Sequence, residues 1–237
     1  EIRLSLVGSE MCIRDSYISG KLWEPGDVKY IDLDGNKVID RGDNRLVDGD
    51  MGDQTIIGNT TPRYQYTFNG YISWKGLSLS VMFQGVGKRD WVAGGAYFWG
   101  FGPYAQVTVF KEHMDYWRPD NPGAYYPKPY INSAGGVAPY QDKNIQRTDL
   151  YLQNAAYCRL KNLTLSYDLP NAWVHKAGLQ KVQVFFSGEN LLTFTKLKGM
   201  FDPEAIFSSN SYTSEGGKNY PMNRVLSCLL YTSDAAD

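Results

Sequence analysis

An acidic loop at residues 32–43 carries the most specific chemical pattern in the sequence. Side chains with oxygen atoms stand at its first, third, fifth, ninth and twelfth positions: Asp32, Asp34, Asn36, Asp40 and Asp43. The backbone carbonyl of Val38 stands at the seventh position. Calcium prefers such a ring of hard oxygen ligands, so this spacing predicts a calcium site.

The acidic loop departs from the calcium-loop pattern at two positions. Lys37 occupies the sixth position, where glycine normally makes a sharp turn, and Asp43 stands where a longer glutamate would bind the ion through both oxygens. Two interpretations therefore stay open: a calcium loop, and an Asp/Asn/Gly turn that needs no metal. Calcium is the one cofactor that the sequence suggests.

Other residues with reactive side chains form no recognisable catalytic motif. His113 and His175 are the two histidines, and neither lies in a nucleophile or metal-binding pattern. The three cysteines, Cys12, Cys158 and Cys228, lack metal-ligand spacing, and their odd number does not suggest a closed disulfide framework. We therefore expect no enzymatic activity, and a glycosidase is a distant alternative.

Aromatic side chains recur in a long proline-rich stretch, residues 87–148. Such rings could stack on sugars, or they could pack on one another or on a partner protein. We favour packing for most of them, and keep five as candidates for substrate or partner contacts: Trp91, Trp99, Trp117, Tyr125 and Tyr126.

Composition narrows the possible classes of protein. The 237 residues include 14% aromatic residues, with 18 Tyr and 24 Gly, and no run approaches the ~18 apolar residues of a membrane-spanning helix. A mean hydropathy of -0.40 is compatible with a transmembrane barrel, because its inward-facing residues are polar. Since 24 basic residues balance 25 acidic ones without a basic cluster, we expect no nucleic-acid partner.

Period-two alternation predicts β-strands in the middle of the chain. At residues 63–74, the even positions from Tyr64 to Trp74 are mostly apolar and the odd positions are mostly polar. Residues 77–85, 162–169 and 182–186 alternate in the same way. The strands are about as long as the ~9–11 residues that cross a bilayer at a tilt. The prediction is an all-β fold, an incomplete antiparallel transmembrane β-barrel with long extracellular loops; a soluble sandwich would alternate too.

The connections predict which strand ends lie together. Lys75 and Gly76 make a tight hairpin, and residues 171–180 make a compact connection, whereas residues 87–148 are long and rich in proline. Hairpin geometry puts short and long connections at opposite rims. We therefore expect Trp91, Trp99 and Trp117 to lie on the side opposite the Lys75–Gly76 turn.

Both ends of the chain differ from the rest. Residues 1–16 and 228–237 resemble translated sequencing-adapter read-through, and we interpret each as a non-native extension. The expected domain is residues 17–227. We expect neither 4–16 nor 228–237 to pair with the strands.

Six segments, read together, resemble the C-terminal region of the SusC/RagA family of TonB-dependent outer-membrane transporters. They are GDVKY at 26–30 before the acidic loop, IGNTTPRY at 57–64, YWRPDNP at 116–122, YCRLKNLTLSY at 157–167, SGENL at 187–191 and FDPE at 201–204. Each is weak alone, but they follow one another in order over most of residues 26–227.

The resemblance implies the last third of a large barrel, of about 22 strands in transporters of this kind. It implies import of glycan or peptide fragments across the bacterial outer membrane with energy from TonB, which would be contacted through a region N-terminal to this one. It also implies a SusD-like lipoprotein partner at the long loops, and outer-membrane lipid around the barrel. The alternatives are a soluble carbohydrate-binding β-sandwich and a structural surface protein with calcium-stiffened loops.

Overall fold

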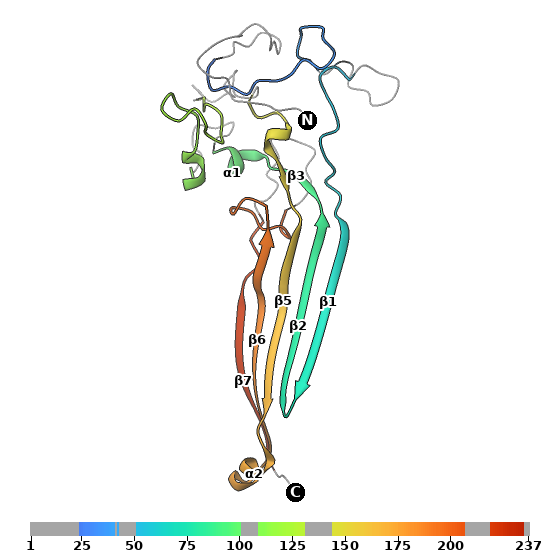
Figure 1. Cartoon of the computed structure of the whole chain (residues 1–237). Coiled ribbons are helices and arrows are strands. Elements are labelled where there is room, and N and C mark those ends of the chain that lie inside the picture. Colours follow the sequence, from blue (N-terminus) through green and yellow to red (C-terminus); the bar gives the residue numbers. More distant parts are fainter. Residues whose placement is uncertain are drawn as a thin grey trace. The chain divides into compact units, whose positions relative to one another are not determined.

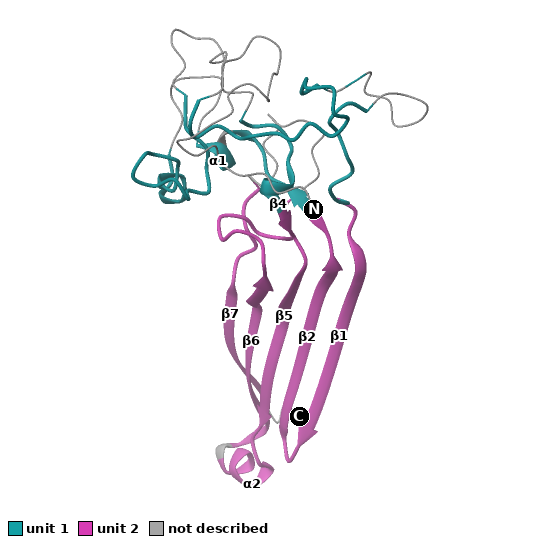
Figure 2. Cartoon of the chain, turned by 45° about the horizontal axis from the view of Figure 1, so that its top comes forward, with its two compact units in different colours: residues 1–59, 91–152, 207–218 teal, residues 60–90, 153–206, 219–237 magenta. Residues whose placement is uncertain are grey.

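The computed structural model describes residues 24–40, 42, 51–100, 109–130, 144–206 and 219–234. The chain forms two compact units, coloured separately in Figure 2. The sheet unit comprises residues 60–90, 153–206 and 219–237, and the loop unit comprises residues 1–59, 91–152 and 207–218.

The sheet unit contains an antiparallel five-stranded sheet in the order β1-β2-β5-β6-β7. Figure 1 shows these long strands side by side. Their bounds are β1 Arg63–Trp74, β2 Leu77–Lys88, β5 Tyr157–Asp168, β6 Leu179–Thr195 and β7 Val225–Asp234. Two short strands, β3 Asp90–Val92 and β4 Leu152–Asn154, pair in a separate sheet.

Helical segments are short. They are α1 Gly95–Trp99, η1 Lys111–Met114, η2 Asp149–Tyr151, α2 Asn171–Val174 and η3 His175–Ala177. Within the described residues, none of the helices has the length and apolar character needed to cross a membrane.

The register of the five strands gives the sheet one apolar and one polar face. Cross-strand neighbours in one row are Ile72, Leu79, Leu165, Phe186 and Cys228. The adjacent row is Tyr71, Ser80, Thr164, Ser187 and Ser227. Because successive side chains in a strand point to opposite faces, these rows define the apolar face and the polar face. The alternation predicted from the sequence is confirmed.

The turn between β1 and β2 fixes this register. Lys75 has φ 48° and Gly76 has φ 85°, so both central residues are left-handed, as a two-residue type I′ hairpin turn requires. The carbonyl oxygen of Gly76 accepts a hydrogen bond from the Asp168 amide at 2.9 Å. The turn is therefore also tied to the end of β5.

A β-bulge in β5 changes the alternation near the other end of the sheet. Phe83 pairs with Leu160 and Met82 pairs with Asn162, which leaves Lys161 without a partner in β2. A bulge of this kind places two successive side chains on one face. Lys161 and Asn162 therefore share the polar face, while Leu160 and Leu163 keep to the apolar face.

The C-terminal segment pairs with the sheet, so the expectation that residues 228–237 make no ladder contact is wrong. β7 pairs with β6 from Glu189↔Val225 to Leu179↔Asp234. The exposed edge of β6 offers backbone donors and acceptors to any extended segment, whatever its origin. The segment also keeps period two, because Leu226, Cys228 and Leu230 fall on the apolar face. Residues 1–16 lie outside the described part, and the interpretation of both ends as non-native stays a prediction.

The short and long connections leave the sheet at opposite ends. β1 and β2 meet at Gly76, whereas β2 ends at Lys88 and β5 begins at Tyr157, next to Val86. The long stretch thus starts and finishes at the end away from the turn, called here the loop-side end. The position of the indoles of Trp91, Trp99 and Trp117 relative to that turn stays a prediction.

Replacing Gly76 by alanine is expected to lower the free energy of unfolding more than replacing Gly178. Both glycines have left-handed φ angles, +85° and +74°, which cost a residue with a Cβ about 1–2 kcal/mol. A Cβ at position 76 would also lie 2.9 Å from the Asp168 carbonyl oxygen, whereas nothing lies within 4 Å at position 178. Urea unfolding of the full-length protein measures both losses, and equal losses would contradict the role of the Asp168 contact.

Candidate functional site

The acidic loop brings three carboxylates together. Oxygen atoms of Asp32, Asp34 and Asp53 all lie within 4.8 Å of one another. Asp32 and Asp34 belong to the predicted ligand set. Asp53 does not, because it follows the predicted loop by ten positions and no local spacing links it to Asp32.

Backbone amides organise these carboxylates. Asp32 accepts hydrogen bonds from the amides of Gly35 at 2.6 Å and Lys37 at 2.8 Å. Asp53 accepts one from the Leu33 amide at 2.6 Å and one from the Asp40 amide at 3.0 Å. Such side-chain-to-backbone bonds make the turn by themselves.

The other predicted ligands have separate partners. Asp40 accepts a hydrogen bond from the Gly42 amide at 2.7 Å. Asn36 accepts one from the Val38 amide at 2.7 Å and donates one to Asp34 at 2.7 Å. Asp43 lies outside the described residues. Asp32, Asp34 and Asp53 would hold a cation, and its binding stays a prediction.

The pKa values of two neighbouring carboxylates in the acidic loop shift in opposite directions. The hydrogen bond from the Lys37 amide lowers the pKa of Asp32, and burial opposes it only in part. The Asn36 amide lowers the pKa of Asp34, but desolvation and the negative charges of Asp32 and Asp53 outweigh it, so the pKa of Asp34 is raised. Mutual repulsion of this kind is what a bound cation would relieve.

The aromatic residues of the loop unit form a packed core around Phe98. Phe98 contacts the rings of Trp99 and Tyr126 edge-on, with centroids 4.8 and 5.4 Å apart, and Trp99 lies 4.7 Å from Tyr151. Trp91, Trp99 and Tyr126 are buried. This burial favours the packing interpretation over the exposure that a substrate or partner contact needs.

The two remaining aromatic candidates are half-buried. Tyr125 packs against Tyr126 and Tyr151, with centroids 5.0 and 5.5 Å away. Trp117 covers Gly26, where a Cβ would collide with the indole ring. The glycine of the GDVKY segment is therefore required by this contact and by its φ of +95°.

His113 serves the same core. Its Nδ1 accepts a hydrogen bond from the Phe110 amide at 3.0 Å, and its Nε2 lies 3.0 Å from the Tyr97 carbonyl oxygen. The imidazole is buried and its ring packs edge-on against Tyr126. Both ring nitrogens are thus engaged by backbone groups.

A buried carboxylate joins distant parts of the loop unit. Asp27 is fully buried and accepts hydrogen bonds from the Glu24 amide, from Tyr130 Oη at 2.8 and 2.9 Å, and from Asn144 Nδ2 at 2.8 Å. Asn144 in turn accepts one from the Val28 amide at 3.0 Å. A buried charge with this many donors is well compensated, so the cluster holds three chain segments together.

A second buried charge cluster lies in the sheet unit, and chemical motifs alone did not identify it. Arg159 contacts Asp202 at 2.8 Å and Glu204 at 2.9 Å, and Lys161 contacts Glu204 at 2.8 Å. Arg159 and Lys161 come from the YCRLKNLTLSY segment, and both acids come from FDPE. The signal available in the sequence was the joint presence of these two segments.

Comparisons with known proteins agree with the resemblance. No protein-family model matches the chain. TonB-dependent receptor P3 of Formosa agariphila is 31% identical over 188 residues, which cover 79% of this chain and 16% of the relative. TonB-dependent receptor P26 of the same organism is 25% identical over 181 residues, which cover 76% of this chain and 16% of the relative.

Solved structures of the RagAB peptide importer are similar to this chain. Its "open-open" state matches with a TM-score of 0.51 and 25% identity, over 80% of this chain and 20% of the importer chain. A structure of the RagAB peptide transporter matches with a TM-score of 0.51 and 27% identity, over 78% and 19%. The resemblance to the SusC/RagA transporters and the fold as an antiparallel barrel fragment are confirmed. The chain spans 16% of the length of these curated relatives.

We predict that calcium binding to the acidic loop gives a measurable heat in the parent protein. Asp34→Asn should abolish this heat, and Asp40→Asn should largely preserve it. Asp34 belongs to the three converging carboxylates, whereas Asp40 bonds the Gly42 amide. Calorimetric titration of the full-length protein with calcium chloride measures this difference. No heat in the parent, or identical heat in all three proteins, would leave an ordinary turn.

The stability of the loop unit is expected to fall as the pH rises from about 10 to about 12. Burial raises the pKa of Tyr125 to about 12, while an unfolded tyrosine titrates near 10. Above pH ~10 the unfolded chain loses this proton first, so alkali favours unfolding. Tyr125→Phe should make the decline shallower, measured by tryptophan fluorescence in urea at pH 9, 10 and 11. An unchanged slope would contradict the assignment to Tyr125.

Proposed function

We propose that this chain forms part of the barrel wall of an outer-membrane, TonB-dependent nutrient importer. Its apolar face would contact outer-membrane lipid, and its polar face would line the interior. The observation that carries the proposal is the two-faced sheet, in which apolar and polar rows alternate across all five strands.

The apolar face is broad and exposed. Phe68 is 61% exposed, Ile72 68% and Trp74 66%. Large exposed apolar surfaces mark contacts with membranes or partner proteins. A soluble sandwich would bury this face against a second sheet of similar size, and the other sheet among the described residues has two short strands.

The turn end of the sheet carries the aromatic residues expected at a membrane interface. Trp74 and Tyr167 share the last apolar row, with Leu77 between them. Trp173 of α2 is also exposed, and Lys75 lies over the Trp74 ring at 4.9 Å. Aromatic girdles flank the lipid-facing band of outer-membrane barrels, so this end would lie at the periplasmic interface.

The similar proteins support one substrate class for this proposal. The solved neighbours are peptide importers, which supports peptide fragments over glycans as the cargo here. TonB would supply the energy through parts of the transporter outside this segment. A SusD-like surface lipoprotein would contact the loop unit and deliver the cargo.

Placing an arginine on either face of β2 tests the proposal with two adjacent residues. Val81 lies in an apolar row with Gly70, Leu163 and Gly188, and Met82 faces the opposite side. Arginine on a lipid face near the bilayer centre costs about 2–4 kcal/mol. We therefore expect Val81→Arg to reduce the folded transporter in the outer membrane strongly, and Met82→Arg to reduce it little.

Heat-modifiable migration in gels measures the folded fraction, and uptake of labelled peptides or oligosaccharides by the same cells measures transport. Equal defects in both variants would refute a lipid-facing sheet. Uptake of oligosaccharides alone would refute the peptide assignment and retain the barrel.

A further inference from the structure

The charge cluster around Arg159 is buried although it lies on the sheet. The side chains of Arg159, Asp202 and Glu204 are 3%, 8% and 11% exposed. Arg159 Nε also donates a hydrogen bond to Thr193 Oγ1 at 2.8 Å, so the guanidinium bonds three different side chains. Such a fork geometry is specific to arginine and fixes its partners in orientation as well as distance.

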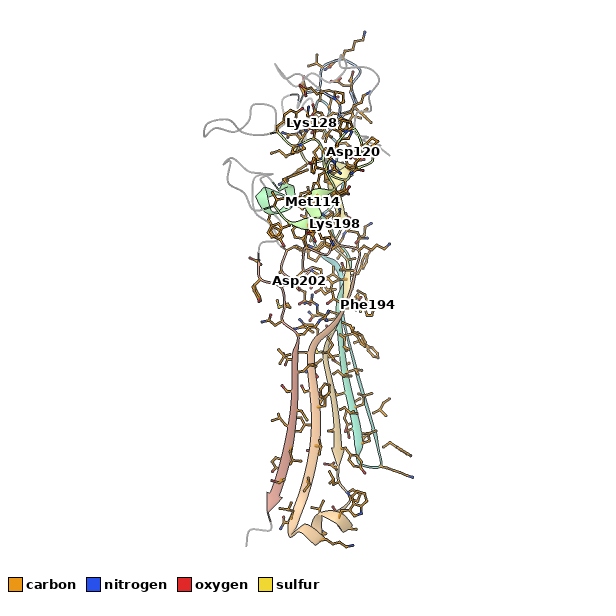
Figure 3. All side chains as sticks on the ribbon, turned by 90° about the vertical axis from the view of Figure 1, so that its left-hand side faces the viewer. Met114, Asp120, Lys128, Phe194, Lys198 and Asp202 are labelled. Atoms are coloured by element: carbon orange, nitrogen blue, oxygen red, sulfur yellow. The ribbon has the colours of Figure 1, made fainter. Side chains whose placement is uncertain are left out.

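The cluster lies on the polar face, near the loop-side end. Cys158 and Leu160 flank Arg159 in β5 and pair with Gly85 and Phe83 on the apolar face. Arg159 therefore points the other way, and its partners must lie there too. Figure 3 shows Asp202 and Phe194 labelled on opposite sides of β6.

Lys161 supplies a second cation on the same face, two residues along β5 from Arg159. Lys161 has no partner in β2, and its ammonium contacts Glu204 at 2.8 Å while remaining 24% exposed. Burial acts to raise the pKa of Asp202, but the Glu204 amide and the Arg159 guanidinium outweigh it and lower that pKa. Asp202 therefore remains charged beside Arg159.

The segment held by these cations is packed. Residues 197–206, called here the ledge, bury the side chains of Leu197, Phe201, Ala205 and Ile206. Its end is closed by hydrogen bonds from the Met222 amide to Asp202 at 3.0 Å and from Asn219 Nδ2 to the Ala205 carbonyl at 2.9 Å. The ledge is thus joined both to β5 and to the chain that leads into β7.

We propose that Arg159 is a positioning residue that holds the ledge on the inner wall of the passage, where the ledge sets the size limit of the imported molecule. The inference rests on the proposed function, because only in a closed barrel does the polar face line a passage. Any segment packed on that face takes up part of the cross-section. A ledge held by a buried ion pair keeps its place, since removing one partner leaves an uncompensated buried charge.

The test uses the full-length transporter in cells, with Ala205→Cys in a background whose native cysteines are replaced by serine. A membrane-impermeant maleimide measures exposure of position 205, and uptake of labelled peptides of increasing length measures the size limit. Arg159→Met should raise the labelling rate at least about tenfold, because removing one partner of a buried ion pair costs more free energy than removing one neutral hydrogen bond. It should also admit longer peptides.

Two matched variants separate positioning from general damage. Arg159→Lys should give intermediate values for both readouts, since one ammonium cannot reproduce the bidentate fork. Lys161→Met should change both little, because Glu204 keeps its bond to Arg159. If Arg159→Met does not reach the membrane, the labelling rate and the size limit of Arg159→Lys test the proposal instead.

Unchanged labelling in the Arg159 variants would refute the positioning role. Raised labelling with an unchanged size limit would refute the ledge as a size filter. If the parent took up no peptide of any length, the peptide-import proposal would fail and the size filter with it, while the labelling ratio would still decide whether Arg159 holds the ledge.

Discussion

The register of the five long strands is the constraint on which the rest of this structure depends. Side chains alternate with a period of two residues, so a slip of one residue would move every apolar side chain to the polar face. The left-handed turn at Lys75 and Gly76 sets the register of the first pair. Gly85 of β2 also fixes the register with β1 and β5. Tyr66 of β1 lies across this glycine, and its hydroxyl donates to the Tyr157 carbonyl oxygen of β5 at 3.3 Å. Any Cβ at position 85 would collide with both groups.

Given that register, the bulge at Lys161 decides where charge can be buried. Unbroken alternation from Leu163 would put Lys161 and Arg159 on the apolar face, and the bulge turns both onto the polar face instead. Two cations can then compensate the two acids of the FDPE segment, which would be costly to bury alone. On the opposite face the same strand presents Leu160 and Leu163, so the apolar rows are not interrupted. The bulge in β5 thus allows apolar packing on one face of the sheet and ion pairing on the other.

The loop unit has its own means of holding irregular chain in place. Backbone groups outside regular strands must find partners, and here side chains supply many of them. Asp27 and Asn144 join segments more than a hundred residues apart in sequence, while Asp32 and Asp53 bond the amides of the acidic loop. Edge-on aromatic contacts around Phe98 fill the interior. The glycine and aspartate of the GDVKY segment are thus explained by a packed indole and a buried carboxylate.

The sequence by itself determined the features that depend on neighbours along the chain. Alternation identified the strands and their faces, the Lys75–Gly76 pair identified the hairpin, and six short segments identified the type of transporter. Tertiary structure alone decided the features that join distant residues. It placed Asp53 beside Asp32, buried Trp91 and Trp99 in a core, and paired residues 225–234 with β6. It also placed Asp202 against Arg159, 43 residues away in sequence. The physical reason is that periodicity and turn chemistry act over a few residues, whereas burial and ion pairing depend on which segments the fold brings together.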